Sequence, residues 1–256
     1  MLLVADVGNT DTVLAGWDRE ELKHVWRADS RTHRTADEWA VLLRGLLEPA
    51  GLGLVDVEDL VLGSVIPEVT RMLSTMSRKH LGREALVVTS TSALGIAMEV
   101  DDPSQVGVDR LVDCLAAWAR KPVASCVIDF GTATTFNYIK ASGAFGGGMI
   151  APGIKTSLEA LASRGAQLRA VPIEAPPKTI GTNTVHAMQS AIVHGYAALV
   201  DGLVGKMESE AGAKLRVVAT GGLAPVIAPH CARIDEVVET LTVEGYRIAW
   251  KTLRGR

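Results

Sequence analysis

The chain begins with Leu2-Leu3-Val4-Ala5-Asp6-Val7-Gly8-Asn9-Thr10-Asp11-Thr12-Val13-Leu14, two apolar runs on either side of a glycine–asparagine pair. This pattern predicts two strands joined by a tight turn, in which Gly8 and Asn9 supply the positive φ angles. Asp6 stands at the end of the first strand, beside a glycine that lets backbone N–H groups approach a ligand closely. Taken alone, the stretch is as typical of an ordinary hairpin as of a binding site.

The same pattern occurs a second time near the middle of the chain, in Val127-Ile128-Asp129-Phe130-Gly131-Thr132-Ala133-Thr134-Thr135-Phe136. The recurring residues, at matching offsets, are Asp6, Gly8 and Thr12 in the first copy and Asp129, Gly131 and Thr135 in the second. An internal repeat at half the chain length predicts two related domains, which we place at residues 1–115 and 116–256. Two such turns facing one another would hold a polyphosphate with its cation, because Mg²⁺ is typically held by one or two carboxylates and phosphate oxygens.

The overall composition is that of an ordinary soluble protein. The 256 residues are 48% hydrophobic and 21% charged, with a net charge of −3, so nothing indicates a nucleic-acid-binding field or an acidic tail. The three scattered cysteines are typical of free thiols in a reducing compartment. No stretch approaches the ~20 apolar residues of a membrane span, and Asp6 interrupts the first apolar run too early for a signal peptide. We therefore expect a cytoplasmic protein with neither nucleic acid nor membrane as partner.

Hydrophobic periodicity predicts an alternation of strands and helices along the rest of the chain. After the first hairpin, the expected strands are 21–28, 60–65, 85–89, 123–129, 134–139, 145–150 and 215–220. The expected helices open at Thr35 with a capping box to Glu38, run through 69–76, open near Gly107, and cover 154–168, 185–203 and 243–253. This order is typical of an α/β protein with mixed sheets.

Three further segments carry candidate ligand residues. Asp109 and Arg110 open a predicted helix, where the dipole favours the aspartate but not the arginine, so the pair is either a simple cap or part of an anion site. The hydroxyls of the polar turn 179–184 either cap the next helix or meet a ligand. Gly221 and Gly222 lie between a strand and a helix start, where unpaired N–H groups commonly contact a nucleotide.

Together these segments resemble the superfamily of acetate and sugar kinases, heat-shock chaperones and actin, and within it the type III pantothenate kinase family. The segments that carry the resemblance are Asp6-Val7-Gly8-Asn9-Thr10, Trp26-Arg27, Thr35-Ala36-Asp37-Glu38, Ser64-Val65-Ile66-Pro67, Gly107-Val108-Asp109-Arg110, Asp129-Phe130-Gly131-Thr132-Ala133-Thr134, Gly148-Met149-Ile150-Ala151-Pro152-Gly153, Gly181-Thr182-Asn183-Thr184 and Thr220-Gly221-Gly222. The resemblance covers nearly the whole chain. It implies duplicated actin-like (ribonuclease H-like) α/β domains, each a mixed five-stranded sheet with flanking helices.

The resemblance also implies an activity, the ATP-dependent phosphorylation of pantothenate to 4′-phosphopantothenate, the first step of coenzyme A biosynthesis, in a homodimer. The implied cofactors are ATP, Mg²⁺ and a monovalent cation, K⁺ or NH₄⁺. The residues implied to contact ATP and its metal are Asp6, Val7, Gly8, Asn9, Thr10, Asp11, Thr12, Val13, Thr132, Gly221 and Gly222. Those implied to line the pantothenate site are Val100, Gly107, Val108, Asp109, Arg110 and Thr184, with Asp109 as the catalytic base. Asp6 and Asp129 are the implied metal ligands, Asp129 for the monovalent cation.

The chain departs from the family at position 100, where Val100 replaces the usual tyrosine that contacts pantothenate. Two other functions therefore stay open: a kinase of another small-molecule alcohol or acid, and a non-catalytic nucleotide-binding accessory or regulatory factor. The presence of Asp6, Asp109 and Asp129 favours catalysis over the second alternative. The lack of a basic field argues against direct DNA binding.

Overall fold

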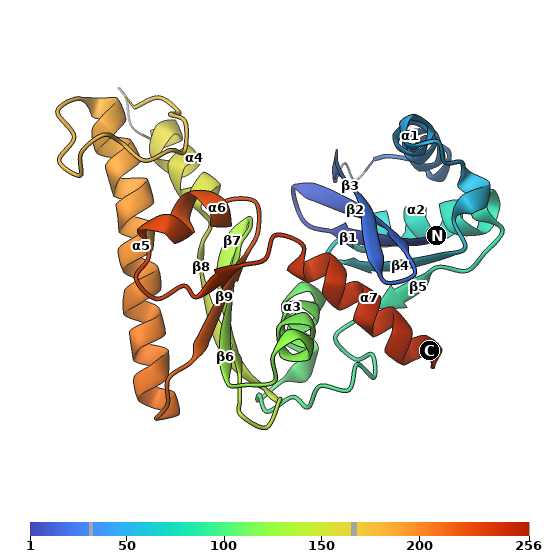
Figure 1. The fold of residues 1–256 in the computed structure, drawn as a ribbon. Helices are drawn as coiled ribbons and strands as arrows, with labels where there is room; N and C mark the ends of the chain where they lie inside the picture. Colours follow the sequence, from blue (N-terminus) through green and yellow to red (C-terminus); the bar gives the residue numbers. More distant parts are fainter. Residues whose placement is uncertain (31–32, 165–167, 256) are drawn as a thin grey trace. The chain divides into compact units, whose positions relative to one another are not determined.

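The computed structural model describes residues 1–30, 33–164 and 168–255. The chain divides into two compact units, the first made of Met1–Ile96, Asp101–Ala116 and Thr242–Arg256, and the second of Ala97–Val100 and Ala117–Leu241. Each unit contains one mixed five-stranded sheet with flanking helices (Figure 1), which confirms the predicted fold class. The domain limits 1–115 and 116–256 stay a prediction, because compact units are defined by contacts alone.

The sheet of the first unit is built around the predicted hairpin. β1 (Leu2–Val7) pairs antiparallel with β2 (Asp11–Asp18), and β3 (Glu21–Asp29) completes the meander. β4 (Asp59–Ser64) lies parallel to β1 on its other side, followed by β5 (Leu86–Val88). The strand order is β3-β2-β1-β4-β5, so the first strand of the chain lies in the middle of the sheet.

One face of this sheet is covered by α1 (Ala36–Leu47) and α2 (Pro67–Met76), whose apolar side chains pack on the odd-numbered residues of β1. α1 begins with the predicted capping box, in which Thr35 Oγ1 accepts a hydrogen bond from Glu38 N and the Glu38 carboxylate accepts one from Thr35 N. Each bond satisfies an N–H group that has no partner within the helix. The sequence alone therefore located the start of this helix.

The opposite face of the first sheet carries α7 (Leu241–Arg254), where Trp250 Nε1 donates to Asp59 Oδ2 at 2.8 Å. α3 (Val108–Arg120) packs closely on α7 at Gly245, where a Cβ atom would lie only 2.0 Å from the carbonyl oxygen of Val112. The last helix of the chain therefore packs with the first unit, a long-range placement that the local periodicity of residues 243–253 does not indicate.

The second sheet repeats the arrangement of the first. β6 (Ser125–Phe130), β7 (Ala133–Ile139) and β8 (Phe145–Pro152) form an antiparallel meander. β9 (Arg216–Thr220) lies parallel to β6, and the two-residue β10 (Glu236–Val237) adds the last strand, giving the order β10-β9-β6-β7-β8. The sequence did not predict β10, because two residues carry no recognisable period.

Three helices pack on one face of the second sheet: α4 (Ile154–Arg164), α5 (Thr184–Ala211) and α6 (Ala224–Ile227). The predicted end of the first of these at residue 168 cannot be compared, because residues 165–167 lie outside the described part of the chain. α5 extends well beyond the predicted limit at residue 203 and ends at Gly212, whose φ of +65° is the left-handed cap that glycine favours.

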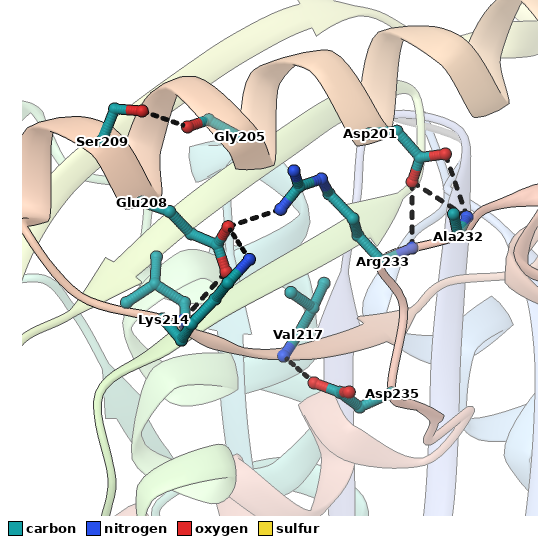
Figure 2. A network of polar contacts seen from close by, with 10 residues as sticks. Asp201, Gly205, Glu208, Ser209, Lys214, Val217, Ala232, Arg233 and Asp235 are labelled. Carbon is teal, nitrogen blue, oxygen red and sulfur yellow. Dashed lines mark hydrogen bonds and ion pairs between the residues drawn. The ribbon is translucent and has the colours of Figure 1, made fainter.

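Polar contacts tie α5 to the segment that follows α6 (Figure 2). The Asp201 carboxylate accepts a hydrogen bond from the backbone N–H of Arg233 at 3.0 Å, and the Arg233 guanidinium pairs with Glu208 further along the helix. Asp235 then accepts a hydrogen bond from Val217 N at 2.7 Å, at the start of β9. The loop is thereby attached to both a helix and a central strand.

Two further expectations concern the whole chain. Cys114 and Cys126 are buried, Cys231 is half-buried, and none of the three forms a disulfide, as predicted. None of the helices in the described residues is both long enough and apolar enough to cross a membrane.

Candidate active site

The turn after β1 is closed by a backbone hydrogen bond from Gly8 N to Asp11 O at 3.0 Å. Neither Gly8 nor Asn9 has a positive φ angle, so the predicted hairpin conformation is wrong at this point. A Cβ atom on Gly8 would lie 3.1 Å from the Asp11 carbonyl oxygen, and this close approach explains the glycine. Asn9, Thr10 and Asp11 are exposed, which leaves the turn open to a ligand.

Other residues of the same motif support the turn from inside. Val7 and Thr12 are buried, and Thr12 Oγ1 forms a 2.8 Å hydrogen bond with Ser30 Oγ. Val13 is half-buried on β2. Within this motif, the side chains of Val7 and Thr12 therefore pack in the core, and the exposed turn residues are the ones able to meet ATP.

Asp6 and Asp109, which come from separate sequence motifs, act on the same buried group in the first unit. Tyr246 of α7 is fully buried, and burial raises the pKa of its hydroxyl well above the usual value of 10.0. The negative charges of Asp6, Asp109 and Asp113 raise the pKa of Tyr246 further, in that order of importance. Three carboxylates of the first unit therefore act electrostatically on one phenol.

Asp109 serves the start of α3 as well as the site. Its Oδ1 accepts a hydrogen bond from Arg110 N at 2.9 Å, and a Cβ atom on Gly107 would lie 2.4 Å from the same oxygen. Gly107 therefore makes room for the folded-back carboxylate, which stays half-buried. Val108 is buried, and burial lowers the pKa of the Arg110 guanidinium while the charges of Cys114 and Asp109 oppose that shift. The capping and ligand interpretations of Asp109 are compatible.

In the second unit, Asp129 lies between two glycines. A Cβ atom would lie 3.0 Å from Asp129 Oδ2 if placed on Gly131, and 2.3 Å from Asp129 Oδ1 if placed on Gly221. Gly221 also has φ of +89°, a conformation that other residues rarely adopt. Because β6 and β9 are parallel and pair Asp129 with Thr220, the residue after Thr220 comes directly beside the carboxylate.

The turn after Asp129 is held in place by the start of α4 and by Gly153 just before it. Thr132 is exposed, and its carbonyl oxygen accepts a hydrogen bond from Thr156 Oγ1 at 3.0 Å. A Cβ atom on Gly153 would lie 2.0 Å from the same carbonyl oxygen. Gly153 therefore allows the start of α4 to approach the turn after Asp129.

The other predicted pantothenate contacts lie in the second unit, whereas Gly107 to Arg110 belong to the first. Thr184 is exposed at the start of α5, where Asn183 Oδ1 accepts the capping hydrogen bond from His186 N at 2.9 Å. The cap is thus an amide and not one of the predicted hydroxyls. Val100 is half-buried, with Cγ1 3.8 Å from the position of a Cβ atom on Gly147.

Sequence reasoning missed Tyr246 and Gly63. Tyr246 falls within the predicted helix 243–253 and Gly63 within the predicted strand 60–65, and neither is among the predicted site residues. A glycine inside a strand often marks the close approach of another group, so Gly63 did carry a signal. Which group approaches it could not be read from the sequence, because Tyr246 is far away in the chain.

The carboxylates suit a metal that is shared with a phosphate. Across residues 1–30, 33–164 and 168–255, no group of three or more His, Cys, Asp or Glu side chains is arranged to hold an ion. Mg²⁺ keeps several waters and is commonly bound through one or two carboxylates and substrate phosphates. Single carboxylates beside open glycine turns, as at Asp6 and Asp129, fit that chemistry.

Comparison with known proteins agrees with this geometry. A sequence profile described as type III pantothenate kinase matches residues 2–206. The type III pantothenate kinase of Geotalea uraniireducens (strain Rf4) is 43% identical over 254 residues, covering 99% of each chain. This chain belongs to the type III pantothenate kinase family. The glycine turns and carboxylates described above therefore lie in a chain that is similar to a type III pantothenate kinase over nearly its whole length.

Solved structures place this type III pantothenate kinase family member in the expected fold. A Baf family transcriptional activator from Campylobacter jejuni superimposes with a TM-score of 0.63 at 14% identity, covering 99% of this chain and 100% of that one. The activator of 2-hydroxyisocaproyl-CoA dehydratase from Clostridium difficile, with bound ADPNP, gives 0.55 at 14% identity, covering 100% and 97%. At such low identity the likeness shows the fold alone, which is the duplicated actin-like architecture.

Proposed function

We propose that this chain transfers the γ-phosphoryl group of ATP to the 4′-hydroxyl of pantothenate, the first step of coenzyme A biosynthesis. The structural observation that carries the proposal is that Asp6 of β1 and Asp109 of α3 belong to the same unit, where the charges of both act on one buried hydroxyl. One carboxylate ends a strand at an open turn, and the other opens a helix beside an arginine. Membership of the type III pantothenate kinase family supplies the substrate.

The chain's own residues supply mostly positioning and charge. The exposed turn at Asn9 and Thr10 offers backbone groups to the ATP phosphates, and Asp6 faces the metal, which neutralises phosphate charge when bound. Asp109 accepts the proton of the attacking hydroxyl, which can leave late because the transition state of phosphoryl transfer is loose. Arg110, half-buried next to it, holds an anionic group of the substrate.

In the second unit, Thr132, Gly221 and Gly222 contact ATP, and Asp129 binds a monovalent cation, K⁺ or NH₄⁺. Two observations support the cation site. The Asp129 carboxylate is enclosed by glycine backbone at Gly131 and Gly221, so no bulky side chain blocks it. The buried Thr220 Oγ1 beside it has no hydrogen-bond partner within the described residues and is available as an oxygen ligand.

The active form is a homodimer in this proposal. Large apolar side chains are exposed on the second unit, with Ile150 on β8 at 67%, Leu161 on α4 at 43% and Ile180 before α5 at 83%. A contiguous exposed apolar patch commonly marks an interface, and in this proposal these three side chains belong to one such patch. Light scattering should show Ile150→Lys shifting the mass from dimer towards monomer, with Val55→Lys in the first unit as the control. A monomeric wild-type protein would contradict the dimer.

The kinase proposal is tested by ADP release from purified protein with ATP, Mg²⁺ and pantothenate, in K⁺ or NH₄⁺ compared with Na⁺. Asp109→Asn should lower turnover by about 10²–10⁴-fold, the usual contribution of a positioned general base. Asp18→Asn makes the same chemical change at an exposed carboxylate at the far end of β2, and it should leave turnover unchanged. Equal rates in K⁺ and Na⁺ would contradict the cation site alone.

The two alternatives predict different outcomes of the same assay. Turnover with sugars but not with pantothenate would indicate another small-molecule kinase. ATP binding without turnover in any cation would indicate a non-catalytic factor and would make Val100→Tyr the next variant. No specific observation favours that role, because the likeness to the Campylobacter jejuni protein shows the fold alone. Cytoplasmic location stays a prediction from the sequence.

A further inference from the structure

Tyr246 occupies a gap in the first sheet that only a glycine can provide. A Cβ atom on Gly63 of β4 would lie 2.1 Å from Tyr246 Oη and 2.2 Å from its Cε1. Any side chain at position 63 would therefore displace the phenol. We call this gap the Gly63 notch; it is filled by the hydroxyl end of Tyr246.

The Gly63 notch adjoins Asp6. β1 and β4 are parallel, and their register pairs Asp6 directly with Gly63. Side chains of paired residues on neighbouring strands project from the same face of a sheet. The Asp6 carboxylate therefore leaves the sheet on the side where Tyr246 Oη lies, and Asp6 is the charged group with the largest electrostatic effect on that hydroxyl.

The hydroxyl is arranged as a donor to Asp6. The side chain of Tyr246 is fully buried, and Oη has no acceptor at full hydrogen-bond geometry among the described residues. Burial is the main cause of its raised pKa, and a hydrogen bond towards the Asp6 carboxylate is the smallest of the causes. Hydrogen bonds that serve catalysis are often long before substrates bind and tighten in the complex.

The close packing of α3 against α7 explains why the charges of Asp109 and Asp113 also act on the Tyr246 hydroxyl. Gly245, next to Tyr246, lets α7 approach the Val112 carbonyl oxygen of α3. Asp109 and Asp113 lie one turn apart on α3, on either side of that contact. Like charges repel one another, so Asp109 and Asp113 also bear on where the Asp6 carboxylate lies.

We propose that Tyr246 is a positioning residue for phosphoryl transfer, donating its hydroxyl hydrogen to Asp6 and thereby fixing which carboxylate oxygen faces the metal–nucleotide complex. The inference rests on the kinase function proposed above and adds a residue to its machinery. Partners that orient a metal-binding carboxylate typically contribute 10–100-fold to metal affinity or activity, by general experience with such sites. The loss of the hydroxyl should therefore be felt in nucleotide binding as well as in turnover.

Tyr246→Phe tests the inference, because it removes only the hydroxyl and keeps the ring. The matched control is Tyr138→Phe, the same change on a half-buried tyrosine of β7 that packs against the core of the second unit. Calorimetry with the Mg²⁺ complex of a non-hydrolysable ATP analogue measures affinity, and steady-state kinetics give kcat and the KM for pantothenate. Tyr246→Phe should weaken the affinity and lower kcat, each by about 10–100-fold, and raising the Mg²⁺ concentration should restore part of the loss.

A structural role would give a different pattern. Tyr246→Phe should keep or raise the melting temperature, because it deletes a buried hydroxyl without a full hydrogen bond. Unchanged nucleotide affinity and kcat would overturn the inference, and so would a loss of both accompanied by a fall in melting temperature. Wild-type protein without pantothenate turnover would contradict the kinase function instead. A weaker affinity of Tyr246→Phe for the Mg²⁺–nucleotide complex would then still support the positioning role.

Discussion

Each unit places a carboxylate at the equivalent point of its own sheet. The groups that surround this carboxylate differ between the two units. In the first unit Asp6 pairs with Gly63 on the parallel neighbour, and a phenol from a distant helix fills the Gly63 notch. In the second unit Asp129 pairs with Thr220, and glycine backbone encloses the carboxylate. The local motif therefore sets where the carboxylate stands, while the neighbouring strand decides what it meets.

The turns of the two copies also differ in length. The last pairs before the turns are Val7 with Thr12 and Phe130 with Thr134, so the first turn is one residue longer. The structural counterpart of Thr12 is thus Thr134, and the match of Thr12 with Thr135 by sequence offset is wrong. A slip of one residue along a strand moves a side chain to the other face, which is why Thr12 and Thr134 are both completely buried.

The largest effect should come from filling the glycine enclosure of the second unit. Gly221→Ala would put a Cβ atom 2.3 Å from Asp129 Oδ1 at a φ of +89°. We expect kcat to fall by about 100-fold or more, since a displacement of about 1 Å at a catalytic group has that effect. Gly212→Ala is the control, because Gly212 also has a positive φ, of +65°, and the added Cβ would meet no atom within 4 Å. If both variants keep full activity, the enclosure is not needed.

A smaller effect should follow from filling the Gly63 notch. Gly63→Ala should cost about 1–3 kcal/mol of unfolding free energy through overpacking, and should weaken Mg²⁺–nucleotide binding because Tyr246 is displaced from Asp6. Gly45→Ala, in α1 with no atom within 4 Å of the added Cβ, should be neutral or slightly stabilising. Denaturant titration and calorimetry give both quantities. If Gly63→Ala bound the Mg²⁺–nucleotide complex with wild-type affinity, the filling of the Gly63 notch by Tyr246 would not matter for function.

Substitution of the two buried threonines, Thr12 and Thr134, should have different effects on the free energy of unfolding. Thr12 Oγ1 bonds Ser30 Oγ, so Thr12→Val leaves a buried hydroxyl unpaired and should cost about 1–3 kcal/mol. Thr134 Oγ1 has no hydrogen-bond partner in the described part of the chain, so Thr134→Val should be neutral or stabilising. Urea unfolding of the two variants measures the difference. Equal destabilisation would show that Thr134 has a partner after all.

The smallest effect concerns the polar contacts of Figure 2, which lie in the second unit. A hydrogen bond from Lys214 lowers the pKa of Glu208, helped by the Leu215 N–H and by the charges of Lys214 and Arg233. A lowered pKa in the folded state means that stability is present above the unfolded pKa of about 4.3 and is lost as pH falls through the folded value.

Glu208→Gln should therefore lower the unfolding free energy by about 0.2–1 kcal/mol at pH 7, and the difference from wild type should shrink in acid. Glu210→Gln, an exposed residue two positions further along α5, is the control. Unfolding titrations at neutral pH and at successively lower pH values make the comparison. A difference that stays constant into acid would exclude ionic pairing as its source.

The sequence by itself determined the order of strands and helices apart from β10, the capping box at Thr35, and the family. It also determined that Asp6 and Asp129 end strands and that Asp109 opens a helix. These features depend on short-range chemistry: the hydrophobic period of one element, a cap, or a glycine beside a carboxylate. The motifs also recur at matching places in the two halves, so the duplicated sheets could be predicted.

Only the tertiary structure decided which distant groups surround each carboxylate. The register of β1 against β4 pairs Asp6 with Gly63, and the crossing of α3 and α7 brings in Tyr246. Parallel strands are joined by long connections, so their register depends on how whole faces pack and leaves no local signature in the chain. The length of the first turn likewise depends on how the two strands of the hairpin pair. The structural counterpart of Thr12 in the second unit therefore follows from the strand pairing and not from the sequence offset.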